Sequence, residues 1–208
     1  MTIKEKIRVL SDIYAGALNK QMISRMDEME SDDNSHYLIY KVLGISDKEG
    51  KLIDQYQNKG RFLYKYAGAF LEEAAIYCIK ERYPDASKCR IANTIGKKPK
   101  TFEIDCLVNM YALEIKWRDA TTDGDHITKE HTRVQVIENA GYTPVRVMFY
   151  YPNRSQAQKI QATLKTLYTG VRGYYYSGDD AWRFIKDFTG YDLLKILQDI
   201  AEEKLKGC

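Results

Sequence analysis

Residues 102–116 of this chain read FEIDCLVNMYALEIK, two apolar runs separated by Asn109 and Met110. A two-residue turn at that point folds the runs onto each other as an antiparallel hairpin, with Val108 opposite Tyr111. Apolar residues on both sides of each run predict that this strand pair is buried on both faces.

Polar side chains share one face of the predicted hairpin. The register places Asp105 opposite Glu114 and Glu103 opposite Lys116, and opposed residues share a face. The other face carries Ile104, Cys106, Leu113, Ile115 and Trp117. Facing like charges destabilise a sheet, and buried lone carboxylates are costly, so something must offset the repulsion between Asp105 and Glu114.

A divalent cation is the simplest partner for two facing carboxylates. Mg²⁺ binds one or two carboxylates and keeps several waters, which suits a phosphate-bearing substrate. Zinc prefers His or Cys, and the hairpin offers only Cys106, on the opposite face. Lys116 is no metal ligand, but its ammonium can orient an attacking water or balance charge on a phosphate. A surface hairpin with an ordinary cross-strand salt bridge is the alternative interpretation.

Length and composition are typical of a soluble globular protein. The chain has 208 residues, 44% apolar and 29% charged, and we expect a single domain over residues 1–208. An apolar run of about 18 residues is absent and the N-terminus is charged, which argues against a membrane span and a signal peptide. The spacing of Cys78, Cys89, Cys106 and Cys208 indicates free thiols, so we expect a cytoplasmic protein. A net charge of +3 permits a nucleic-acid partner without requiring one.

The remaining segments are mainly helical by their apolar periodicity. We expect helices at residues 2–29, 52–82, 128–140, 155–168, 179–188 and 191–205, the second of them broken near Gly60 or Gly68. Strands are expected at 90–95 and 143–151, with 36–43 either a short helix or a strand and 174–176 a short aromatic run. A helix between the hairpin and strand 143–151 predicts a parallel crossover, and hence a mixed sheet flanked by helices.

This order of elements resembles the PD-(D/E)XK nuclease superfamily. The motif matches Asp105, Glu114 and Lys116, and the family's helix glutamate falls on Glu72, with Glu73 as the alternative. The proline of the motif is absent, since isoleucine precedes Asp105. The resemblance implies an α/β fold with a restriction-endonuclease-like mixed sheet, a catalytic core at about residues 60–151 and helical additions on both sides.

Within that superfamily, a short chain with a long polar loop after the Glu-x-Lys motif resembles a type II restriction endonuclease, and residues 114–127 are similar to the ApaLI-like group. The resemblance implies Mg²⁺-dependent hydrolysis of double-stranded DNA at a short, palindromic sequence. Asp105, Glu114 and the backbone carbonyl of Ile115 would bind the metal, and Glu72 would reach a second metal or its water. Lys116 would position the attacking water in line with the departing 3′ oxygen.

Polar residues after the hairpin, and a few basic residues elsewhere, are candidates for DNA contacts. Arg, Lys and Thr side chains bind phosphates, whereas Arg, His and Asp can also read base edges. The candidates are Arg118, Thr121, Thr122, Asp123, Asp125, His126, Lys129, His131, Arg133, Arg61, Lys65 and Lys98. An ordinary solvated loop and helix face is the alternative interpretation.

The type II resemblance also implies partners. A homodimer would match the twofold symmetry of a palindromic site, and a cognate DNA methyltransferase is expected in the same bacterial or archaeal cell. Two other functions stay open. One is a junction-resolving or repair nuclease of the same superfamily, and the other is a non-catalytic DNA-binding module in which the acids and Lys116 form a structural network.

Overall fold

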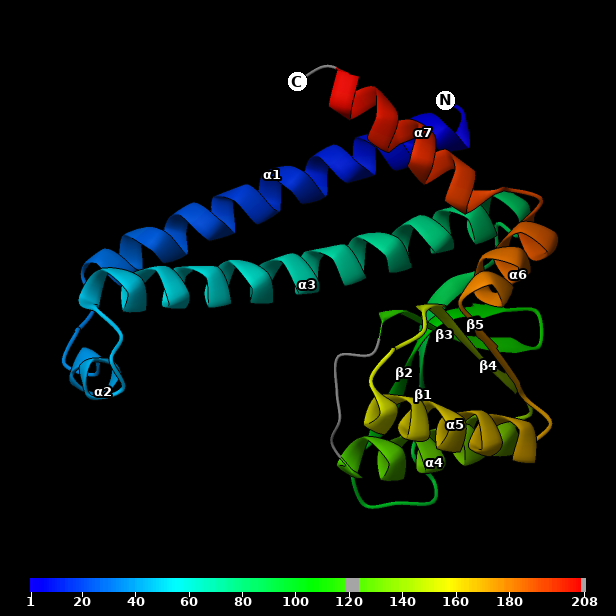
Figure 1. Ribbon diagram of the computed structural model, residues 1–208. Helices are drawn as coiled ribbons and strands as arrows, with labels where there is room; N and C mark the ends of the chain where they lie inside the picture. Colours follow the sequence, from blue (N-terminus) through cyan, green and yellow to red (C-terminus); the bar gives the residue numbers. More distant parts are fainter. Residues whose placement is uncertain (119–123, 207–208) are drawn as a thin grey trace. The chain divides into compact units, whose positions relative to one another are not determined.

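The chain folds into two compact units (Figure 1). The sheet unit comprises Met1–Ile7 and Leu71–Cys208, and the helical unit comprises Arg8–Phe70. The computed structural model describes residues 1–118 and 124–206, without the side chains of residues 124–126. The single domain expected over residues 1–208, with its core at about 60–151, stays a prediction.

A five-stranded mixed sheet forms the centre of the sheet unit (Figure 1). The spatial order of its strands is β1 (Ser87–Ala92), β2 (Thr101–Val108), β3 (Tyr111–Arg118), β4 (Thr143–Tyr150) and β5 (Tyr174–Ser177). β2 is antiparallel to both β1 and β3, whereas β4 is parallel to both β3 and β5. Helix α4 (Gly124–Asn139) connects β3 to β4, which confirms the predicted crossover and the α/β class.

Helices cover both faces of this sheet. α4 and α5 (Ser155–Gly170) lie side by side on one face (Figure 1), where Glu130 of α4 bonds to Arg146 of β4 and to Tyr168 of α5. α6 (Asp179–Thr189) packs on the other face, where the rings of Trp182 and Phe149 of β4 have centroids 4.3 Å apart. α7 (Leu193–Lys206) completes this unit with the start of α1 and the end of α3. Because strand neighbours alternate between faces, side chains that share the face of Arg146 point toward α4 and α5.

The central hairpin forms as predicted around Asn109 and Met110. Its regular pairs are Val108 with Tyr111, Leu107 with Ala112 and Cys106 with Leu113. Asn109 has a φ of 51°, a left-handed conformation that Asn tolerates in tight turns. The first strand lies earlier than expected, at Ser87–Ala92, and the aromatic run at 174–176 is part of strand β5.

The predicted position of Glu103 beside Lys116 is wrong. The Glu103 carboxylate lies 2.7 Å from Lys88 Nζ and 3.4 Å from Arg90 Nη2, both on β1. Glu103 pairs with Arg90 across the β1–β2 ladder, so these two basic side chains reach it first. The polar cluster around Lys116 therefore has one acid fewer than the hairpin register predicted.

The helical unit contains α2 (Tyr37–Val42) and most of two long helices, α1 (Ile3–Glu30) and α3 (Asp47–Arg82). Tyr14 of α1 contacts Tyr66 and Phe70 of α3, with ring centroids 6.3 and 5.9 Å apart. α3 is continuous, so the predicted break near Gly60 or Gly68 is wrong. One helical glycine costs about 1 kcal/mol, which a long packed helix tolerates. Within the described ranges, every helix is too short or too polar to cross a membrane.

Candidate active site

Asp105, Glu114 and Lys116 meet at one point of the sheet unit, as the sequence predicts. Lys116 Nζ lies 3.3 Å from Asp105 Oδ2 and 2.7 Å from Glu114 Oε1. The two carboxylates come from neighbouring strands, β2 and β3, and a single cationic group lies between them. The Lys116 ammonium is thus a positive charge that both acids share.

The backbone opens locally around Asp105. The regular β2–β3 pairs end at Cys106 and Leu113, one residue before the two acids. Beyond that pair, the amide of Ile115 donates to Asp105 Oδ2 at 2.8 Å. A buried amide requires a partner, and here a side chain takes the place of the neighbouring strand. The arrangement fixes the Asp105 carboxylate against the peptide that joins Glu114 to Ile115.

Burial and charge act differently on the two acids. Asp105 and Glu114 are 6% and 5% exposed. Burial, reinforced by the charge of Glu114, raises the pKa of Asp105. Burial acts against ionisation of Glu114 as well, but Lys116, Arg133 and Arg146 together hold its pKa below the usual value. Glu114 is therefore a fixed anion, whereas Asp105 remains short of compensating positive charge.

Glu72 of α3 belongs to the same electrostatic site. Burial raises its pKa to about 7, and the charges of Asp105 and Glu114 add to that shift while Lys116 and Lys88 oppose it. Its Oε1 atom lies 3.9 Å from Lys88 Nζ. These interactions favour Glu72 over its neighbour Glu73 as the helix acid. Lys88 was missed from the sequence, because it precedes the strand that was expected at residues 90–95, whereas the structure includes it in β1.

A buried chain of charges continues behind Glu114. Arg133 Nη1 of α4 donates to Glu114 Oε2, and Arg133 Nε lies 3.0 Å from Glu130 Oε1. Glu130 Oε2 accepts hydrogen bonds from Arg146 Nη1 and from the Tyr168 hydroxyl, both at 3.1 Å. Both oxygens of Glu114 are thereby engaged, one by Lys116 and one by Arg133. The arrangement fixes the orientation of the Glu114 carboxylate.

The sequence offered a signal for this chain of charges. Glu130 and Arg133 are three residues apart on one helix, a spacing at which opposite charges meet. Arg146 is the single charged residue in the apolar strand Thr143–Tyr150, and a buried charge needs a partner. What the sequence could not give is the pairing between α4 and β4, which depends on how the helix packs on the sheet.

The candidate DNA-contacting residues fall into three groups. In the sheet unit, Arg118, Lys129, His131 and Lys98 are exposed, whereas Arg133 is engaged with Glu114 and Glu130. Arg61 and Lys65 belong to the helical unit, where they lie over the rings of Phe62 and Tyr66. Thr121, Thr122 and Asp123, with the side chains of Asp125 and His126, lie outside the described residues. Their DNA contacts stay predictions.

The donor set around Asp105 and Glu114 fits magnesium by its chemistry. Within residues 1–118 and 127–206, no three His, Cys, Asp or Glu side chains gather closely enough to hold a metal ion by themselves. Mg²⁺ does not need three, because it binds one or two carboxylates and retains water. Two buried carboxylates that share one cationic neighbour, with the peptide of Ile115 alongside, meet that requirement.

Comparison with known proteins identifies the family of the chain. A family model for ApaLI-like restriction endonucleases matches residues 1–202. Neither the curated proteins nor the solved structures contain a match to the chain. Because the family match covers nearly the whole sequence, including both units and every residue of the cluster around Lys116, the chain belongs to the ApaLI-like restriction endonuclease family and is a type II site-specific deoxyribonuclease that acts on double-stranded DNA.

Proposed function

We propose that the cluster around Lys116 is the catalytic site and that it hydrolyses DNA phosphodiesters with Mg²⁺. The observation that carries this proposal is the shared ammonium, 3.3 Å from Asp105 and 2.7 Å from Glu114. Two buried carboxylates held this close repel each other, and the cost is offset only while a cation lies between them. A site of this kind favours the uptake of a second cation.

Asp105 and Glu114 would hold the magnesium ion, with the carbonyl of Ile115 as a third ligand. When bound, Mg²⁺ supplies Lewis-acid polarisation of the phosphate and makes a water more acidic. The negative charge of Asp105 is the less compensated of the two, because burial and the charge of Glu114 both raise its pKa. Glu72 would hold a water or a second ion, since the charges of Asp105 and Glu114 both raise the pKa of its carboxyl group.

Lys116 would act on the water and the phosphate rather than on the metal. Its side chain is one-third exposed, so its ammonium can reach both the buried acids and a substrate at the surface. It would hold the attacking water in line with the departing 3′ oxygen and balance the charge that develops on the phosphate. The water oxygen forms the new bond to phosphorus as the bond from phosphorus to the 3′ oxygen breaks.

Arg133 would be a positioning residue that acts through Glu114. Its guanidinium bridges Glu114 and Glu130, and Glu130 is in turn fixed by Arg146 and Tyr168. A carboxylate fixed on one oxygen leaves the other in a constant direction. Arg133 would therefore support catalysis from within the protein, in place of the DNA contact that its position in the sequence suggested.

The enzyme class also suggests an oligomeric state, a type of target sequence and a partner enzyme. We propose that it cuts a short palindromic sequence as a homodimer, because twofold symmetry in the protein matches twofold symmetry in the DNA. It would act in the cytoplasm of a bacterium or archaeon whose own DNA is protected by a cognate methyltransferase. Exposed Arg118, Lys129, His131 and Lys98 would contribute contacts to the DNA.

Digestion of phage DNA tests the proposal directly. With Mg²⁺ the wild-type enzyme should give discrete fragments, and chelation with EDTA should abolish them. Ca²⁺ should support DNA binding in a gel-shift assay but little cleavage. A smear of fragments would contradict sequence-specific cutting, and equal cleavage with Ca²⁺ or EDTA would contradict the proposed role of magnesium.

A further inference from the structure

A cavity opens at the carboxyl ends of the parallel strands β3 and β4 in the sheet unit. Its volume is about 540 Å³. Sites for small ligands occupy about 300–1,000 Å³, so a nucleotide-sized group fits. Two arginines, three aromatic side chains and one amide side chain line it: Arg118, Arg154, Trp117, Tyr150, Tyr151 and Asn153. This cavity is called the β3–β4 cavity below.

The β3–β4 cavity begins just beyond Lys116. Arg118 follows Lys116 by two residues on β3, so the two side chains leave the same face of the strand, with Cα atoms about 6.5 Å apart. Arg118 pairs with Tyr150 of β4, as Lys116 pairs with Met148. Nucleotides of one strand advance about 3.4 Å each along a duplex. A strand whose scissile phosphate lies at Lys116 therefore reaches the cavity within about two nucleotides.

The segment after β4 that lines the cavity is tied to α5. The Tyr151 hydroxyl donates to the carbonyl oxygen of Gln158 at 3.5 Å, and Gln158 Nε2 donates to the carbonyl oxygen of Pro152 at 3.2 Å. Arg154 directly precedes the first residue of α5. The two arginines thus reach the cavity from different elements, β3 and the start of α5. A site formed before binding loses less conformational freedom when its ligand arrives.

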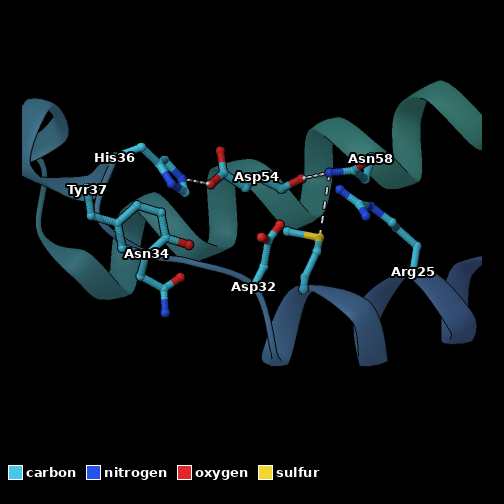
Figure 2. A pocket seen from close by; sticks show the side chains of 8 residues that line it. Arg25, Asp32, Asn34, His36, Tyr37, Asp54 and Asn58 are labelled. Atoms are coloured by element: carbon cyan, nitrogen blue, oxygen red, sulfur yellow. Dashed lines mark hydrogen bonds and ion pairs between the residues drawn. The ribbon is translucent and has the colours of Figure 1, made fainter.

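Charge distinguishes the β3–β4 cavity from a cavity in the helical unit, which Figure 2 shows. The latter holds about 240 Å³, and its lining includes Arg25 and two acids, Asp32 and Asp54. His36 Nε2 lies 3.2 Å from Asp54 Oδ2 there. By contrast, the described residues that line the β3–β4 cavity carry two guanidinium groups and no carboxylate. The β3–β4 cavity therefore favours an anion, which the two acids of the helical-unit cavity would repel.

The aromatic side chains indicate which anion fits the β3–β4 cavity. Tyr150 and Tyr151 are 49% and 41% exposed, so their rings can contact a ligand. Arginine binds phosphate through its planar set of donors, and aromatic rings stack on bases of any sequence. Free phosphate would use only the arginines, whereas a nucleotide would use both kinds of side chain. Because the faces of a paired base are covered by its neighbours, a base can stack on these rings only after it leaves the duplex.

We propose that the β3–β4 cavity binds one unstacked nucleotide of the DNA strand that is cut. Arg118 and Arg154 contact its phosphate, and the aromatic side chains contact its base. The inference rests on the proposed catalytic site and assigns the surface that holds the strand beside Lys116. Its test measures binding rather than cleavage.

Trp117 provides a direct signal from the cavity. The chain has two tryptophans, and Trp182 packs on Phe149, so Trp182→Phe leaves Trp117 as the single indole and keeps an aromatic ring in the packing. A short single-stranded oligothymidylate, whose bases are already accessible, should quench Trp117 fluorescence in EDTA. The same concentration of inorganic phosphate should not. Quenching of equal size by phosphate would overturn the assignment to a nucleotide.

Substitutions in this background separate the phosphate from the base. Arg154→Ala should weaken binding of the oligothymidylate several-fold and lower the slope of log affinity against log salt by about 0.7. Tyr151→Ala should weaken it about 10-fold with the salt slope unchanged, and Tyr151→Phe should retain most of the affinity. The matched control is Lys165→Ala, which removes a charge from an exposed position of α5 about 16 Å further along the helix.

Duplex DNA tests whether a base leaves the stack. In a gel shift with phage DNA and Ca²⁺, Tyr151→Ala should weaken binding as it does for the single strand. An effect on the single strand without one on the duplex would overturn the proposal, as would equal affinities of Tyr151→Ala and the wild type for the oligothymidylate. The fluorescence measurements need neither a metal ion nor cleavage, so an inactive Mg²⁺ site leaves them unaffected and a failed test leaves the catalytic site standing.

Discussion

The two units of the molecule depart from ordinary burial in opposite ways. In the sheet unit, Glu114, Glu130 and Arg146 are at least 95% buried although each can carry a charge. In the helical unit, Leu38 and Val42 are mostly exposed although they are aliphatic. Charged residues are rarely buried unless paired, and large apolar patches are rarely exposed. The difference teaches that burial alone does not tell charged from apolar residues in this chain, because pairing decides the first case and packing the second.

Those two costs are of different kinds. The buried charges are compensated inside the sheet unit, since Arg133 and Lys116 engage Glu114 while Arg146 and Tyr168 engage Glu130. The exposed aliphatic stripe of α2 has no such compensation within its own unit. The first arrangement fits the proposed active site, whereas the second leaves aliphatic side chains in contact with solvent.

Substitution of Lys116 by Ala should have the largest effect, because it removes a charge on which the buried cluster of the sheet unit depends. The change removes the cation between Asp105 and Glu114 and the group proposed to hold the water. We expect cleavage with Mg²⁺ to fall about 10³-fold or more while DNA affinity with Ca²⁺ stays within a few-fold. Initial cleavage rates and gel shifts measure the two effects, with Lys165→Ala, at an exposed position of α5, as the control. Loss of binding equal to the loss of cleavage would contradict the proposed role.

Substitution of Arg133 by Met tests whether the buried charges act as one unit. It leaves Glu114 and Glu130 without a shared cation, which should cost about 3 kcal/mol in the free energy of unfolding. The turnover rate should also fall, with little change in the KM for DNA, because the orientation of Glu114 is lost. Arg133→Lys should recover part of the turnover rate, which a purely structural role would not require.

The control for Arg133 is a pair with the same spacing at the surface. Arg183 and Asp180 are also three residues apart, at 3.1 Å, but their side chains are 67% and 66% exposed. Arg183→Met should change the free energy of unfolding by less than about 0.5 kcal/mol. Urea denaturation measures both variants, and equal effects at the two positions would remove the distinction between buried and exposed charge.

Glu72 gives a test that depends on pH. Its pKa is raised to about 7, so the folded protein holds this proton more tightly than the unfolded chain does. Glu72 therefore destabilises the fold progressively as the pH rises from about 4.5, its ordinary value, to about 7. In EDTA at pH 8, Glu72→Gln should stabilise the protein by about 2 kcal/mol, and at pH 4.5 it should have little effect.

Glu73→Gln is the matched control for that measurement. It changes the adjacent acid on the same helix, so it separates an effect of the Glu72 carboxylate from an effect of any substitution in this turn of α3. The same pair of variants identifies the helix acid by activity, since only Glu72→Gln should impair cleavage with Mg²⁺. If both variants changed the stability equally at pH 4.5 and pH 8, the effect would not be specific to the Glu72 carboxylate.

Substitution of Arg118 should have the smallest effect, and it tests whether DNA contacts the sheet unit close to Lys116. It is exposed at the end of β3, two residues after Lys116. Arg118→Ala should weaken DNA binding several-fold and lower the slope of log affinity against log salt by about 0.9. Arg61→Ala, in the helical unit, allows the same salt dependence of DNA affinity to be compared between the two units. An unchanged salt slope for Arg118→Ala would contradict a phosphate contact.

Much of the candidate active site could be predicted from local sequence patterns. The alternation of residues 102–116 and the Asn109 turn are local properties, and together they bring Asp105 to Glu114 and Lys116. The helix after the hairpin and the apolar strand that follows it likewise predicted the parallel crossover. Glu103 was misplaced because β1 competes for it, and a single hairpin contains no information about its other neighbour.

The sequence by itself determined the hairpin, its acids and its lysine, because strand periodicity and turn chemistry act over a few residues. Only the tertiary structure decided that Arg133 belongs to Glu114 and that the aliphatic side of α2 faces outward. Both facts depend on which helix packs against which surface, and packing joins residues far apart in the chain. Periodicity indicates which side of an element is apolar, but not whether the molecule covers it.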